Sequence, residues 1–172
     1  MSKAYLLFAA MMVATGSGPV TAQAATPLPT RDFVNAAAQS DAYEIMAGRV
    51  ALIESKDRGV RSFAQQMIDD HTRTSNALRR AANSAGVAPP LPGLGADQQK
   101  SLSALQSVRD GDFDKAYARQ QVLAHEQALV VEQGYATRGT EPAIRQVAQS
   151  AVPMIQHHLA TARQLRATVA GS

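Results

Sequence analysis

Two long helical patterns are separated by the stretch GVAPPLPGLGA, residues 86–96. This stretch contains three prolines and three glycines, which disfavour a helix and favour a loop. The other breaks between long helical patterns are short, at residues 55–57 and near Gly139. Because short breaks join antiparallel helices, the sequence predicts two helical hairpins linked by one long connection.

On both sides of this connection, apolar residues recur at the spacing of an amphipathic helix. We expect long helices at about residues 31–54, 57–85, 112–139 and 140–170, and a short helix at about 97–109. This order predicts a single all-α domain at residues 31–170. The predicted fold is a ferritin-like four-helix bundle with the short helix in the long connection between helices two and three. A plain up-down-up-down bundle is the alternative.

Several residues are expected to set the helix boundaries. Side chains suited to capping stand near each expected start: Thr30, Asp57, Asp97, Asp112 and Thr140. Gly86 is expected to end the second long helix, because glycine readily adopts the left-handed backbone found there. Pro153 falls inside the last helix, where we expect a kink.

Residues 1–24 have the organisation of a signal peptide. Lys3 supplies a positive charge, residues 4–15 form a short apolar run, and Ala22-Gln23-Ala24 matches a small-x-small cleavage site. We therefore expect cleavage near Ala24, a short lead at residues 25–30, and a mature protein in the periplasm or outside the cell.

The composition narrows the kinds of site that the protein can carry. With no cysteine, the chain has no disulfide, thiolate metal site or cysteine nucleophile. Basic residues do not gather into one block, so we expect no nucleic-acid partner. After residue 24 there is no apolar run long enough for a membrane span. The sequence also contains no complete catalytic motif, which leaves open whether the protein is an enzyme.

Each of the four long helices offers one polar side chain on or near its inner face. These predicted metal ligands are Glu44, His71, His125 and His158. Imidazole and carboxylate together suit a divalent ion such as iron, manganese, zinc or copper. We count residues from the tight turn along each helix, with a rise of about 1.5 Å per residue. On this count, the positions of Glu44 and His71 along the bundle axis differ by roughly 5 Å. His125 and His158 differ by roughly 7 to 8 Å on the same basis.

Three further residues are secondary candidates for the metal site: Asp70, Glu126 and His157. We expect the Asp70 carboxylate to orient His71, because carboxylates that hydrogen-bond to metal-binding histidines commonly fix the orientation of the ring. His157 is a substitute for His158, and Glu126 stands beside His125.

Di-iron chemistry is disfavoured. Bundles of that class carry Glu-x-x-His motifs, but Ile68, Val122 and Ile155 stand three residues before the histidines here. A site for one ion, or no metal site at all, is therefore favoured over di-iron chemistry. The alternative to a metal site is that each buried histidine merely satisfies a neighbouring hydrogen-bonding group.

Several motifs resemble those of a known family. They are the run Phe63-Ala64-Gln65-Gln66-Met67-Ile68-Asp69-Asp70-His71-Thr72, Glu44-Ile45 with Gly48, and Val152-Pro153 with His158-Leu159. From about Asp32 to Leu165, the chain resembles the exported bacterial proteins of the domain-of-unknown-function family 4142. The resemblance implies a ferritin-like bundle in the cell envelope with no settled activity. The third-helix motif of that family is often Asp-His, whereas this chain has Ala124-His125-Glu126.

Two functions remain at this point. The first is an exported bundle that binds one divalent metal ion inside the helices. The second is a non-enzymatic protein of the cell envelope or of a stress response, which binds no metal and contacts an envelope protein or a second copy of itself. The two differ in whether the four polar side chains converge.

Overall fold

The computed structural model describes residues 28–91, 93–108 and 110–171. Its elements are α1 (Thr30–Glu54), α2 (Arg58–Ser84), α3 (Ala96–Ser107), the 3-10 turn η1 (Asp110–Asp112), α4 (Phe113–Arg138) and α5 (Pro142–Ala170). These residues contain helices and no strand, which confirms the all-α prediction. The signal peptide predicted at residues 1–24, and residues 25–27 of the predicted lead, lie outside the described residues.

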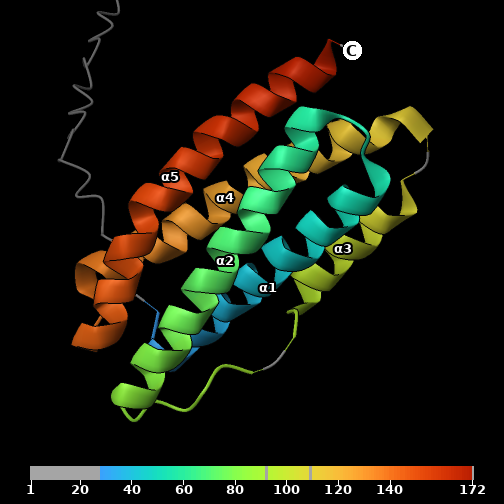
Figure 1. Cartoon of the computed structure of the whole chain (residues 1–172). Coiled ribbons are helices and arrows are strands. Elements are labelled where there is room, and N and C mark those ends of the chain that lie inside the picture. The colour runs from blue at the N-terminus through green and yellow to red at the C-terminus, as the bar shows by residue number, and fades with distance from the viewer. Residues whose placement is uncertain (1–27, 92, 109, 172) are drawn as a thin grey trace, which may run out of the picture.

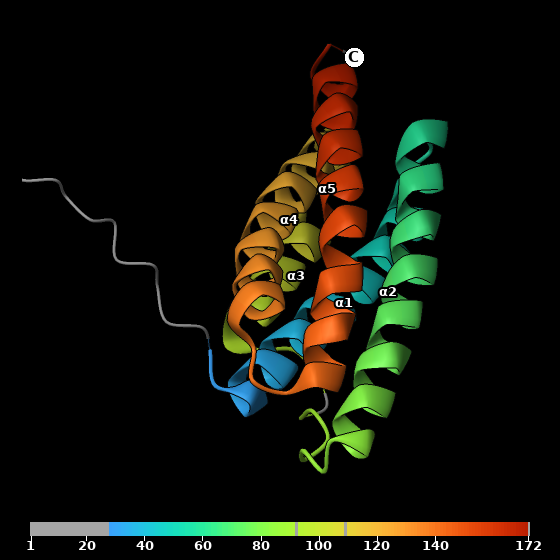
Figure 2. The same ribbon diagram turned by 90° about the vertical axis from the view of Figure 1, so that its left-hand side faces the viewer.

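The four long helices form a bundle of two antiparallel hairpins, α1 with α2 and α4 with α5 (Figure 1). The colours in Figures 1 and 2 show that α2 and α4 run in the same direction, opposite to α1 and α5. The short helix α3 carries the chain back along the bundle beside α1 and α4. The predicted long connection with its own helix is thus confirmed, and the order of directions excludes a plain up-down-up-down bundle.

The second helix has the start and end that its sequence predicts. Asp57 accepts a hydrogen bond from the Val60 backbone N–H at 2.9 Å, which caps the first turn of α2. At the other end, Gly86 adopts a positive φ of 65°. The Gly86 N–H then donates to the Asn83 carbonyl, and the Val87 N–H donates to the Ala82 carbonyl. These two hydrogen bonds close the C-terminal end of α2.

The other four predicted caps are wrong: Thr30, Asp97, Asp112 and Thr140. Helix α1 already includes Thr30, whose hydroxyl instead lies 2.8 Å from the Tyr135 hydroxyl. Gly95 precedes α3 and Glu141 precedes α5. Asp112 does precede α4, but its backbone is helical rather than extended, so its side chain makes no capping bond.

The apolar core is divided into two clusters along the bundle. The first apolar cluster includes Val60, Phe63, Leu105, Tyr117 and Leu165. The second apolar cluster includes Phe33, Val34, Leu78, Tyr135 and Ile144. In the second cluster the rings of Phe33 and Tyr135 stack with centroids 4.0 Å apart. A layer of buried polar side chains lies between the two clusters along each long helix.

Small residues let α1 and α2 approach closely beside this polar layer. A Cβ atom on Gly48 would lie 2.8 Å from the carbonyl oxygen of Ala64 and 2.9 Å from an Ile68 side-chain carbon. Helix α5 passes through Pro153 as one continuous element. Among the described residues, none of the helices combines the length and apolar character that a membrane crossing needs.

Candidate metal centre

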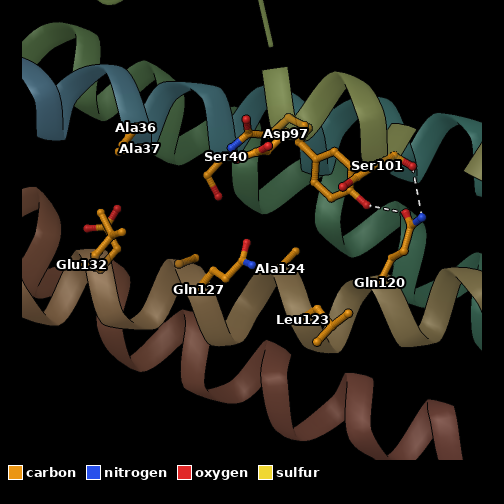
Figure 3. Close-up of a pocket in the computed structure, with 14 residues that line it drawn as sticks. Ala36, Ala37, Ser40, Asp97, Ser101, Gln120, Leu123, Ala124, Gln127 and Glu132 are labelled. Atoms are coloured by element: carbon orange, nitrogen blue, oxygen red, sulfur yellow. Dashed lines mark hydrogen bonds between the residues drawn. The ribbon is translucent and has the colours of Figure 1, made fainter. Parts of the chain in front are cut away.

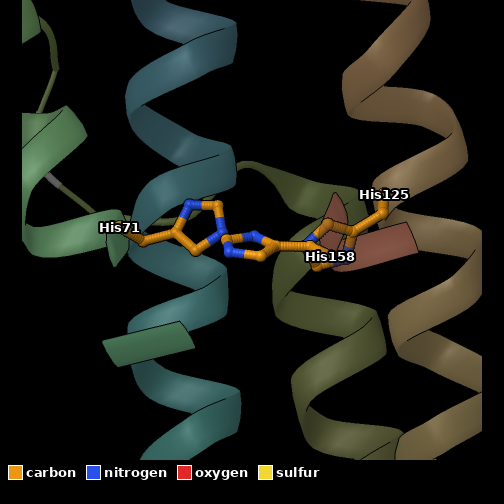
Figure 4. A group of neighbouring side chains, drawn as sticks. All are labelled: His71, His125 and His158. Atoms are coloured by element: carbon orange, nitrogen blue, oxygen red, sulfur yellow. The ribbon is translucent and has the colours of Figure 1, made fainter. Parts of the chain in front are cut away.

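Three histidines from three helices converge in the polar layer. His71 comes from α2, His125 from α4 and His158 from α5, and all three are at most 3% exposed. Their ring centroids lie 5.4 to 5.8 Å apart. One ring nitrogen from each histidine lies within 4.8 Å of the others, a separation that one metal ion can bridge (Figure 4).

Each imidazole is held by a hydrogen bond at one nitrogen. His71 Nδ1 donates to Asp41 Oδ1, and His158 Nε2 donates to Asp70 Oδ2, both at 2.8 Å. His125 Nδ1 donates to the backbone carbonyl of Gln121, also at 2.8 Å. Because each of these acceptors requires an N–H donor, the opposite nitrogen of each neutral ring carries a lone pair.

The opposite nitrogens are buried and unpaired. Within the described part of the chain, His71 Nε2, His125 Nε2 and His158 Nδ1 have no hydrogen-bond partner. Buried polar atoms are nearly always paired, so three orphaned nitrogens in one cluster require an explanation. A metal ion would satisfy all three, and carboxylates behind the rings are the usual support for metal-binding histidines.

Glu44 lies next to this cluster but not within it. Its Oε1 atom is 3.8 Å from His125 Nδ1, the nitrogen that already bonds Gln121. Its Oε2 atom accepts a hydrogen bond from the Gln121 side chain at 2.7 Å. Among the described residues, the group whose ligand atoms meet contains the three histidines without Glu44.

The secondary candidates separate clearly. Asp70 is in the site, but it holds His158; the predicted pairing of Asp70 with His71 is wrong. Consecutive residues of a helix do not face each other, so Asp70 points to α5 while His71 points to α1 and the bundle centre. For the same reason Glu126 and His157 face away from the site. Glu126 pairs with Arg163 at 2.8 Å on the surface, and His157 is exposed.

Asp41 and Gln121 support the histidines and were not among the residues predicted from the sequence. Asp41 is buried on α1 and also accepts a hydrogen bond from Thr74 at 2.8 Å. It stands three residues before Glu44, and therefore on the same helix face, which is a signal that could have revealed it. Gln121 is fully buried one turn before His125. Its role as a backbone acceptor leaves no signature in residue type.

Burial and the surrounding carboxylates give the three histidines different pKa values. Burial lowers the pKa of His158 to about 4, although the hydrogen bond to Asp70 acts in the opposite direction. Burial also lowers the pKa of His125. For His71, the effect of burial is outweighed by the hydrogen bond to Asp41 and the charges of Glu44, Asp41 and Asp70, so its pKa is raised.

These shifts suit the site to a cation. His125 and His158 are neutral at physiological pH and can donate lone pairs directly. His71 is the ring on which a proton is best stabilised in the metal-free protein. Three imidazole nitrogens would hold an ion through a donor set that zinc and copper use in proteins.

Comparisons with known proteins agree with the fold. The Cu(II)-bound form of CopM superposes with a TM-score of 0.70 at 15% sequence identity, covering 83% of this chain and 98% of that chain. A DUF305 fragment from Deinococcus radiodurans gives a TM-score of 0.69 at 15% identity, with 85% and 99% covered. Identities this low show similarity of fold alone. A comparison of the sequence with curated proteins found no significant match.

The sequence itself matches one family model over most of its length. The model is that of the domain of unknown function DUF4142, and the match spans residues 15–165. It therefore includes α1, α2 and α4 in full, α5 as far as residue 165, and each of the three converging histidines. The chain belongs to the DUF4142 family.

Proposed function

We propose that this protein binds one divalent transition-metal ion through His71 Nε2, His125 Nε2 and His158 Nδ1. The observation that carries the proposal is the group of three orphaned, buried nitrogens whose rings are each fixed from behind. A histidine that only filled space in the core would need no such support. Glu44 is proposed as a nearby carboxylate that balances the charge of the ion, and not as a fourth ligand.

Copper(II) is the first-choice ion. Divalent first-row metals bind a nitrogen site most tightly at copper, and imidazole suits copper as well as zinc. The similarity of fold to the Cu(II)-bound form of CopM supports this choice. Zinc is the second choice, because three histidines with an open position are also a common zinc arrangement.

We further propose that the protein works after export, as a ferritin-like bundle of the periplasm or the exterior. The basis is the predicted signal peptide at residues 1–24 and the two hairpins joined by a long crossover. An exported bundle with one buried site would bind and retain the ion rather than catalyse a reaction on a bound substrate. N-terminal sequencing of protein recovered from the periplasm tests the export step. A start near Ala25 supports export, and an uncleaved cytoplasmic chain contradicts it.

The metal proposal is tested with the mature chain from Ala25, purified without a histidine tag. Bound metal is measured by mass spectrometry after exposure to copper, zinc, iron and manganese and removal of excess ion. We expect about one equivalent of copper, with electron paramagnetic resonance showing nitrogen ligands. His71→Ala, His125→Ala and His158→Ala should each lose the bound ion.

His157→Ala is the matched control, because it removes a histidine that is adjacent in sequence but exposed. It should retain the full equivalent. If the three buried-histidine variants bind as much metal as wild type, the proposal is wrong. The protein would then be an envelope or stress-related binding protein without a metal.

A further inference from the structure

A large cavity opens at the surface between α1, α3 and α4. It has a volume of about 270 Å³ and is lined by residues from all three helices (Figure 3). Its mouth includes the exposed side chains of Asp97, Leu123 and Gln127. We call this the outer cavity. Hydrogen bonds from Tyr43 to Gln120, at 2.7 Å, and from Gln120 to the Ser101 carbonyl, at 3.0 Å, join the three helices along it.

A second, small cavity lies deeper in the bundle beside the metal site. It has a volume of about 20 Å³, which is room for about one water molecule, and His71 and Asp41 are among its lining residues. We call this the inner cavity. Four residues line both cavities: Ala37, Ser40, Ala128 and Glu132. Three of the four are small, so little more than the Glu132 side chain separates the outer cavity from the space beside His71.

Glu132 is an unusual residue for such a wall. It is 8% exposed, and its Oε2 atom has no hydrogen-bond partner in the described residues. Burial, with a further contribution from the charge of Asp41, raises its pKa to about 8. Figure 3 shows its side chain extending from α4 at one end of the outer cavity. A buried carboxyl oxygen without a hydrogen-bond partner is costly, and an incoming cation would provide the missing partner.

The inner cavity also borders the opposite surface, between α2 and α5. There the shared wall consists of Thr74, Val147, Ala151 and Met154, which are bulkier on average. The rim on that side carries Arg73, ion-paired with Asp70. The acidic side chains among the described residues of the outer cavity are instead Asp97, which is exposed at the mouth, and Glu132, which gives up its proton when a cation arrives. A divalent cation is therefore attracted to the mouth by Asp97 and opposed by Arg73 on the α2–α5 side.

We propose that metal ions reach the three histidines through the outer cavity, and that Glu132 is a transient ligand that receives the cation there and passes it to the inner cavity beside His71. This inference rests on the proposed function. Asp97 at the mouth concentrates cations, Glu132 replaces part of the hydration shell, and the small wall residues leave space for the ion to pass. Glu132 is thus a positioning residue for loading, separate from the histidines that retain the ion.

The rate of loading tests this route. The mature chain contains no tryptophan, so quenching of tyrosine fluorescence by Cu²⁺ can be followed by stopped flow. Glu132→Gln keeps the shape of the side chain and removes the carboxyl group that can lose its proton to bind a cation. We expect its loading rate to fall at least tenfold, while the metal bound at equilibrium stays near one equivalent. Glu132→Asp, which keeps the carboxylate, should recover part of the rate.

Two further variants make the outcome decisive. Ala128→Leu fills the shared wall and should slow loading even if Glu132→Gln folds poorly. Arg73→Gln removes the cation from the opposite rim and should leave the rate unchanged. Unchanged rates in both Glu132→Gln and Ala128→Leu, or faster loading in Arg73→Gln, would overturn the route. If wild-type protein holds no metal at equilibrium, the proposed function itself fails, which is a different result from an altered route.

Discussion

Asp41→Asn separates a metal site from a polar layer that is only structural. Asp41 Oδ1 accepts hydrogen bonds from His71 Nδ1 and from Thr74, both at 2.8 Å, and the residue is 7% exposed. Asparagine keeps the size and one acceptor but removes the negative charge. The change therefore weakens the hold on His71 and lowers the basicity of the nitrogen that faces the ion.

The expected magnitude follows from these contacts. Loss of a carboxylate behind a metal-binding histidine typically costs 10- to 100-fold in affinity, which is about 1.4 to 2.7 kcal/mol. The metal-free protein should also lose about 1.5 to 3 kcal/mol of stability, the usual value of a hydrogen bond to a buried charged group. Affinity is measured by competition with a chelator of known strength, and stability by urea unfolding of the metal-free protein.

Asp69→Asn is the matched control for Asp41→Asn. Asp69 is an exposed residue on α2, and its carboxylate accepts a hydrogen bond from the Gln65 side chain at 2.9 Å. Among the described hydrogen bonds, none joins Asp69 to the three histidines. Asp69→Asn should leave both affinity and stability close to wild type. A stability loss in Asp41→Asn with unchanged metal affinity would refute the role of Asp41 in the site. Equal losses of affinity in the two variants would do the same.

Three further outcomes are expected. Gly48→Ala should destabilise the protein by about 1 to 3 kcal/mol in urea unfolding, because the new Cβ would lie 2.8 Å from the Ala64 carbonyl oxygen; a neutral result would contradict the close approach of α1 and α2. Metal affinity should weaken about tenfold for each pH unit below the raised pKa of His71, because the ion must displace a proton there. A metal affinity that stays the same when it is measured at several pH values would contradict this. Glu132 has a folded-state pKa of about 8, so the folded state holds its proton between about pH 4.5 and pH 8 while the unfolded state releases it. Stability should therefore fall as pH rises through this window, and Glu132→Gln should remove much of that fall in urea unfolding at several pH values; identical pH profiles for the two proteins would refute the assignment.

The fold could be predicted because its signals are local. Proline and glycine mark the long connection at residues 86–96, and apolar spacing marks the helices on both sides. Three predicted caps were wrong because the helices begin at Thr30, Ala96 and Pro142, each a short distance from the expected start. Asp112 was wrong for a different reason. A capping side chain is effective only where the backbone before the helix is extended, and the backbone of Asp112 is not. Residue type alone carries no information about that dihedral angle.

The cluster of converging histidines was predicted only in part, because convergence depends on how helices align. The expected height difference of roughly 7 to 8 Å between His125 and His158 assumed that every residue after Gly139 adds to the helix. In the structure α4 ends at Arg138 and α5 begins at Pro142, so the connecting residues 139–141 add little height. The two rings accordingly meet with centroids 5.4 Å apart. The partners of the histidines depend on helix rotation, which explains why Asp41 was missed and Asp70 was paired with the wrong histidine.

The polar layer is also where the sequence departs most from what stability alone would favour. Replacing buried ionic groups by apolar residues of similar size is often neutral or stabilising, so a bundle with one continuous apolar core would need no layer of this kind. This bundle instead divides its core around three histidines, and two of them are held by buried aspartates. His71 and His158 each bond an aspartate of a neighbouring helix, His125 bonds a backbone carbonyl of its own helix, and each ring leaves one nitrogen unpaired. Other buried polar atoms among the described residues are also unpaired, including Tyr117 Oη and Glu132 Oε2, but the three histidine rings form one cluster. This is the pattern expected when the exception to the local rules of folding serves a bound ion.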